Sequence, residues 1–77
     1  MDKPVVDVIV DIAPGSDPAR LHEVRTALAD LAGVVRARSS ERLERLVLVG
    51  YDPRVTSSQA ILASVRGHGL AAHLVGM

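Results

Sequence analysis

The amino-acid sequence predicts an α+β domain with the element order βαββαβ. Two β-branched segments, 5–12 and 46–51, are typical of buried strands. Each is followed by a segment whose apolar residues recur at helical spacing. A more polar strand, 34–39, and a short final strand, 70–75, complete two βαβ halves. Right-handed crossovers would place both helices on one face of a four-stranded antiparallel sheet, the ferredoxin-like arrangement.

The first predicted strand and helix are separated by a short loop with strong sequence signals. The residues of the strand that face the core are expected to be Val6, Val8, Val10 and Ile12. Pro14 and Gly15 break the strand. Asp17 followed by Pro18 predicts a helix start, because aspartate caps free N–H groups and proline fits the first helical position. The helical stripe consists of Leu21, Val24, Leu28 and Leu31. Gly33 is expected to end this helix as a left-handed cap.

The second half repeats this pattern after a charged turn at 40–44. The strand at 46–51 ends in Tyr51-Asp52-Pro53, where the chain turns. Thr56 and Gln59 have the spacing of a capping box, with Thr56 as the cap. The buried stripe of the second helix is Ile61, Leu62 and Val65. The segment 67–69, with two glycines, is expected to stop it.

Composition narrows the range of functions. The chain has 77 residues, which predicts one domain spanning 1–77. It has no cysteine and a formal net charge of +0, which argue against thiol chemistry and against a general polyanion or nucleic-acid binder. No apolar run approaches the roughly 20 residues of a membrane span, so no membrane insertion is expected. The N-terminal residues 1–4 lack the features of a signal peptide, and we expect a cytoplasmic location.

Several short motifs resemble one known family. They are Leu28-x-x-Leu31-x-Gly33-Val34, Tyr51-Asp52-Pro53, Ile61-x-x-x-Val65 and Gly69-Leu70-x-Ala72. Together they resemble the heavy-metal-associated domains of copper chaperones, mercury-binding proteins and metal-pumping ATPases, over about Val6 to Val75. The resemblance implies the ferredoxin-like fold and a setting in metal transport or homeostasis.

The metal loop of that family is degenerate here. The family's Met-x-Cys-x-x-Cys falls on the segment 15–20. Gly15 stands at the methionine position, Ser16 follows it, and Asp17 and Arg20 stand at the two cysteine positions. Thiolates bind soft metals because both partners are polarizable. A carboxylate and a permanently charged guanidinium do not replace them. The sequence therefore does not support thiolate metal binding, and no cofactor is expected.

Two other ligand-binding functions remain open. The loop before the first helix and the loop after the second lie at the same end of this topology, so Asp17, His22 and His68 form a candidate O/N/N set for zinc or nickel. The competing interpretation is that Asp17 is only a helix cap and the histidines are surface residues. The βαββαβ order and the Pro14-Gly15 loop also resemble the amino-acid-binding ACT domains, a class of small-molecule sensors.

We expect that the chain is not an enzyme, since its sequence shows neither a nucleophile motif nor paired carboxylates that could form a cleft. The remaining candidate site is the sheet face away from the helices, where Val5, Ile9, Leu46 and Leu48 are expected to cluster. Such a patch predicts contact with a protein partner, or a homodimer packed sheet to sheet. The hairpin arginines 36, 38, 42 and 45 are expected to be neutralised locally by Glu41 and Glu44. The sequence thus predicts a non-catalytic module that works through protein contacts.

Overall fold

The computed structural model describes residues 4–43 and 45–75. The N-terminal residues 1–3, Glu44 and the two C-terminal residues lie outside this description. The elements, in chain order, are β1 (Val6–Ile12), α1 (Pro18–Asp30), β2 (Val34–Ser39), β3 (Leu46–Tyr51), α2 (Ser58–Gly67) and β4 (Ala72–Val75). The predicted βαββαβ order is confirmed, although β1 begins one residue later and β4 two residues later than the sequence suggests.

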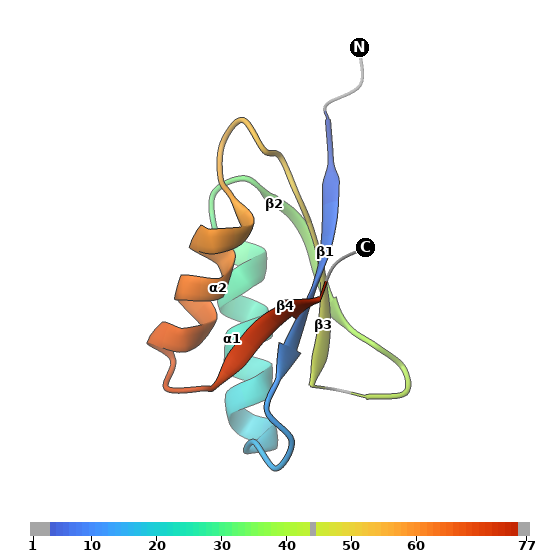
Figure 1. Cartoon of the computed structure of the whole chain (residues 1–77), viewed down its shortest axis with the longest axis vertical. Coiled ribbons are helices and arrows are strands. Elements are labelled where there is room, and N and C mark those ends of the chain that lie inside the picture. The colour runs from blue at the N-terminus through green and yellow to red at the C-terminus, as the bar shows by residue number, and fades with distance from the viewer. Residues whose placement is uncertain (1–3, 44, 76–77) are drawn as a thin grey trace.

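The strands form one antiparallel sheet with the spatial order β2-β3-β1-β4. Both helices lie against the same face of this sheet, and the other face carries no helix in the described part of the chain (Figure 1). The two long, β-branched strands therefore lie at the centre, and the shorter or more polar strands lie at the edges. The predicted ferredoxin-like arrangement is confirmed.

The core lies between the sheet and the helices. It contains aliphatic side chains and one buried tyrosine, namely Val8, Val10, Ile12, Leu21, Val24, Leu28, Val47, Val49, Tyr51, Ile61 and Val65. Val6 was expected in this core but is 41% exposed. The reason is positional: β4 pairs with β1 only from Ile9 onward, so the start of β1 has a neighbouring strand on one side alone. Alternation along a strand predicts which face of the sheet a side chain lies on. The length of the neighbouring strands then decides whether that side chain is buried.

Both helix starts are capped, one of them by a different residue than predicted. Asp17 caps α1 as expected, since one of its carboxylate oxygens accepts a hydrogen bond from the N–H of Ala19 at 2.9 Å. At α2 the predicted cap Thr56 is wrong, because the hydroxyl of Ser57 accepts from the N–H of Ala60 at 3.1 Å. Thr56 and Ser57 both carry a hydroxyl group, so the sequence alone allowed either residue to be the cap.

Gly33 does not act as the predicted helix cap. The helix α1 ends at Asp30, and its cap residue is Leu31 in an extended conformation. Gly33 lies two residues further on, at φ 91°, in the left-handed region that favours glycine. Its carbonyl accepts a hydrogen bond from the N–H of Asp52 at 2.7 Å. Gly33 therefore joins the start of β2 to the turn that follows β3.

That turn is organised by a buried carboxylate. Asp52 is only 6% exposed, and one of its oxygens accepts from the backbone N–H of Arg54 at 2.9 Å. The guanidinium of Arg54 donates to both carboxylate oxygens, at 3.1 and 3.0 Å. This hydrogen bonding, followed by the negative charge of Asp52, raises the pKa of Arg54 above its ordinary value. The Tyr51-Asp52-Pro53 motif thus has a structural role in the turn between β3 and α2.

Candidate functional site

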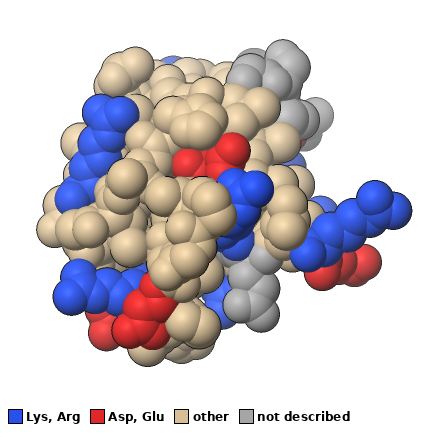
Figure 2. Space-filling model, turned by 60° about the horizontal axis from the view of Figure 1, so that its bottom comes forward, with Lys and Arg blue, Asp and Glu red and all other residues tan. Residues whose placement is uncertain are grey.

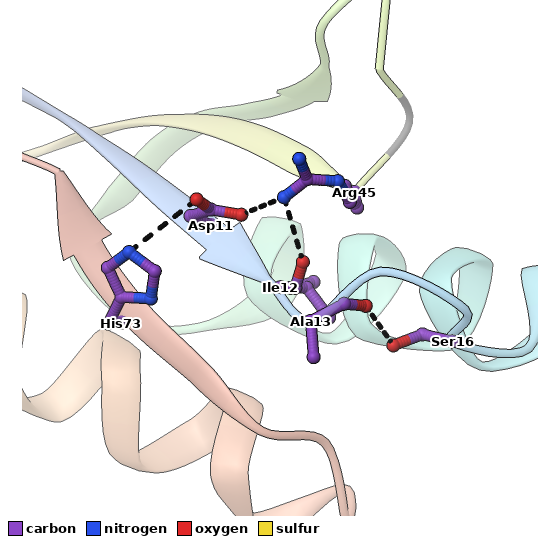
Figure 3. Close-up of polar contacts among 6 residues, drawn as sticks. All are labelled: Asp11, Ile12, Ala13, Ser16, Arg45 and His73. Atoms are coloured by element: carbon purple, nitrogen blue, oxygen red, sulfur yellow. Dashed lines mark hydrogen bonds and ion pairs between the residues drawn. The ribbon is translucent and has the colours of Figure 1, made fainter.

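The loop between β1 and α1 is closed by its own hydrogen bonds. The hydroxyl of Ser16 donates to the carbonyl of Ala13 at 2.6 Å (Figure 3). Gly15 sits at φ 84°, and the carbonyl of Asp17 accepts from the N–H of Leu21 at 3.0 Å. The carboxylate of Asp17 is used as the helix cap described above. The polar groups of this loop therefore serve its own fold.

Arg20 connects this loop to the end of the second helix. Its Nη1 donates to the carbonyl of His68 at 2.8 Å, across 48 residues of chain. Gly69 follows at φ 80°, and a Cβ there would lie 3.2 Å from the same Nη1. At the position where the resembled family has its second cysteine, this chain has a cation that holds the start of α1 near the end of α2. A permanently protonated guanidinium repels a metal cation, so these residues do not fit a soft metal.

The structure does not assemble the O/N/N set that the sequence suggested. The ring Nδ1 of His22 lies 3.1 Å from Arg25 Nη2, which makes the nitrogen the acceptor of that hydrogen bond. The Nδ1 of His68 lies 2.8 Å from the carbonyl of Ser64 and is therefore the donor. Within residues 4–43 and 45–75, no three His, Cys, Asp or Glu side chains are grouped as a metal ion would require. The cap interpretation of Asp17 accounts for its contacts.

The open face of the sheet brings together most of the predicted apolar cluster. Ile9 and Leu48 are direct cross-strand partners, and Leu46 is the next residue of β3 on the same face. These three side chains are half-buried, whereas Val5 is 42% exposed and precedes β1. Val75 pairs with Ile9 from the other side, and sequence reasoning missed it. The alternation of 72–75, with Ala72 and Leu74 facing the core, could have revealed it. We refer to Ile9, Leu46, Leu48 and Val75 as the open-face cluster.

Ion pairs lie on both sides of this cluster along β1. Arg36 Nη2 lies 2.8 Å from Asp7 Oδ1, near the start of the strand. Near its end Asp11 lies between Arg45, with which it forms an ion pair, and His73, whose Nε2 is 3.5 Å from Asp11 Oδ2 (Figure 3). Arg45 also donates to the carbonyl of Ile12 at 3.3 Å. The expectation that hairpin glutamates neutralise these arginines is wrong for Arg36 and Arg45, which pair with β1.

The pairing follows from the sheet register. β3 lies between β2 and β1, and Gly50 of β3 is opposite both Arg36 and Asp7. Because Gly50 has no side chain, the guanidinium reaches across β3 to the carboxylate; a Cβ at Gly50 would lie 3.1 Å from Asp7 Oδ1 and 3.2 Å from Arg36 Cγ. The glycine in an otherwise apolar strand therefore permits a contact between two strands that are not neighbours.

Comparison with solved structures identifies the fold of this chain. No family model and no curated protein sequence matches the chain. Oxidised MerP from Ralstonia metallidurans CH34 is similar, with 18% identity, a TM-score of 0.82 and coverage of 95% of this chain and 100% of that one. A copper form of a CopA variant from Bacillus subtilis shares 21% identity at a TM-score of 0.75, with both chains covered at 100%. The HMA domain of the copper chaperone for superoxide dismutase shares 23% identity at a TM-score of 0.75, covering 100% of this chain and 74% of that one.

These similarities establish the fold class. The chain has the heavy-metal-associated type of ferredoxin-like fold, as the motifs around Gly33 and Tyr51 predicted. It has this fold without any cysteine. In the described part of the chain, no helix is long and apolar enough to cross a membrane.

Proposed function

We propose that this chain is a non-catalytic protein-contact module of a cytoplasmic metal-transport or metal-homeostasis system, and that its contact surface is the open face of the sheet. The partner that this surface suits best is a second copy of the chain. Solved structures of the same fold include a copper form of CopA and a mercury-bound form of MerP, which supports the setting. The capped loop and the Arg20 contact support a role that does not depend on thiolate metal binding.

The observation that carries the proposal is the open-face cluster. Its members lie on the two central strands and on β4, on the side of the sheet away from α1 and α2. Contiguous apolar side chains on the surface of a small domain typically mark an interaction site. The ion pairs at Asp7 and Asp11 satisfy the charged groups beside the cluster, so that a second sheet could cover the face without leaving these carboxylates unpaired.

The charge distribution favours a second copy as the partner. The formal net charge is +0 and the isoelectric point is about 6.8, so two copies do not repel each other at neutral pH. Figure 2, which brings the lower end of the molecule forward, shows basic and acidic side chains side by side, with uncharged surface between them. The open face likewise carries both positive and negative side chains, because Asp7 and Asp11 of β1 pair with Arg36 and Arg45. Two identical faces with charges of both signs can therefore pack together without overall electrostatic repulsion.

Sedimentation velocity over a concentration series tests this proposal. Leu48→Lys places a charge at the centre of the open-face cluster, and Val55→Lys is the matched control, because Val55 is 60% exposed and lies in the turn before α2. Burial of a half-exposed leucine contributes about 1 kcal/mol, and a two-fold dimer loses it twice, which corresponds to a dissociation constant raised by roughly 10- to 100-fold.

We expect the parent and Val55→Lys to associate alike and Leu48→Lys to stay monomeric over the same range. A parent protein that is monomeric at millimolar concentration would contradict the proposal. So would a Leu48→Lys variant that associates as strongly as the parent.

A further inference from the structure

A hollow of about 470 Å³ lies beside the open face, where β2 enters the turn toward β3. Its lining residues are Arg38, Ser39, Ser40, Glu41, Arg42 and Leu48. A smaller hollow of about 140 Å³ shares Arg38 and Leu48 with it. The larger volume is within the range of small-molecule sites. Both hollows therefore combine guanidinium groups with the apolar side chain of Leu48.

The two arginines of the larger hollow, Arg38 and Arg42, differ from the other arginines in their hydrogen bonding. The other arginines of the described chain each donate to a carboxylate, a hydroxyl or a carbonyl: Arg20, Arg25, Arg36, Arg45, Arg54 and Arg66. Among residues 4–43 and 45–75, the guanidinium groups of Arg38 and Arg42 have no such acceptor. The free guanidinium groups of the described fold thus line one hollow.

One hydroxyl group of the hollow adds a further donor. Ser40 Oγ accepts from the N–H of Arg42 at 3.3 Å, so its own proton is free to donate outward. Ser39 Oγ, by contrast, accepts from Arg25 Nη1 of α1 at 2.7 Å, on the helix side of the sheet, so it is not counted as a donor to the hollow. The carboxylate of Glu41 also lines the hollow and offsets one of the two positive charges. The lining therefore keeps an excess of donors and a net positive charge.

We propose that this hollow binds a small oxyanion, a carboxylate or phosphate group attached to a short aliphatic segment. Guanidinium forks match the geometry of carboxylate and phosphate oxygens and form charge-assisted hydrogen bonds to them. Arg38 and Arg42 supply those donors, and Leu48 provides the surface for the aliphatic segment. This site is separate from the degenerate loop before α1, and it goes beyond the proposed contact function.

The test is a ¹⁵N chemical-shift titration with succinate and, separately, with inorganic phosphate. Both are added at constant ionic strength against sodium chloride, at protein concentrations too low for self-association. We expect saturable shifts of the amides of 38–42. Arg38→Gln and Arg42→Gln should each weaken binding about tenfold, since each removes a charge-assisted hydrogen bond. Arg66→Gln is the control of equal charge, because Arg66 lies on α2 and donates to the carbonyl of Ala72.

The outcomes separate this proposal from the protein-contact function. Saturable binding of either anion supports it. Shifts that grow linearly without saturation for both anions would overturn it. Unchanged affinity in a variant that combines Arg38→Gln with Arg42→Gln would also overturn it. Because the titration uses dilute protein, its result does not depend on whether the open face associates.

Discussion

Gly33 offers a sharp test of how the two halves of the fold meet. A Cβ at Gly33 would lie 2.9 Å from Cγ2 of Thr56 and 2.9 Å from Cβ of Val55. Gly15 is the matched control, because it also has a positive φ, 84° against 91°, but a Cβ there would meet nothing within 4 Å. The comparison of Gly33→Ala with Gly15→Ala therefore isolates the close approach from the backbone conformation.

The expected magnitudes follow from these contacts. A left-handed conformation costs an alanine about 1–2 kcal/mol, which applies to both variants. Overpacking against the turn adds about 1–3 kcal/mol at Gly33 alone. The smaller entropy of the unfolded chain with alanine offsets part of the loss equally in both. A domain of 77 residues has a total stability of roughly 4–12 kcal/mol, so Gly33→Ala removes a large part of it.

Urea unfolding followed by circular dichroism measures both variants. We expect the transition midpoint to fall for each, with unchanged slope, and to fall clearly further for Gly33→Ala. Equal losses of unfolding free energy in the two variants would refute the reasoning, since the close approach of Gly33 to 55–56 would then have no energetic effect.

Two further predictions concern the α2 cap and the degenerate loop. Ser57→Ala should lower the free energy of unfolding by about 1 kcal/mol and Thr56→Ala by less, in the same urea assay, because the Ser57 hydroxyl caps α2; a larger loss for Thr56→Ala would contradict this assignment. The parent chain should not compete with a cuprous chelator, whereas a variant combining Asp17→Cys with Arg20→Cys should, because it supplies two thiolates at the loop. Competition by the parent, or none by the double variant, would count against our account of this loop.

The sequence predicted the fold because its local signals agree with one another. Asp17-Pro18 marked the start of α1, and the β-branched segments marked the two central strands. Right-handed crossover then allowed few arrangements. The burial of Val6 was mispredicted, because the number of neighbouring strands at a sheet end depends on the lengths of other elements.

The candidate site was less predictable, since it depends on contacts between distant residues. The pairing of Arg36 with Asp7 spans 29 residues and requires Gly50 to lie between them. No sequence feature of the hairpin indicates this pairing, and the nearby Glu41 led us to expect that it, rather than Asp7, would pair with Arg36. The contact from Arg20 to the His68 carbonyl likewise depends on how the two helices pack. The cross-strand pair of Ile9 and Leu48 could be predicted from the sequence, because the alternation of side chains and the strand order are enough to place it.

The central claim is that copies of this chain meet through the open face, and intermolecular nuclear Overhauser effects test it most directly. A mixture of isotope-labelled and unlabelled protein, with filtered detection, reports only contacts between copies. We predict cross-peaks among the methyl groups of Ile9, Leu48 and Val75. Cross-peaks confined to α1 and α2, or none at concentrations where sedimentation shows a dimer, would contradict it.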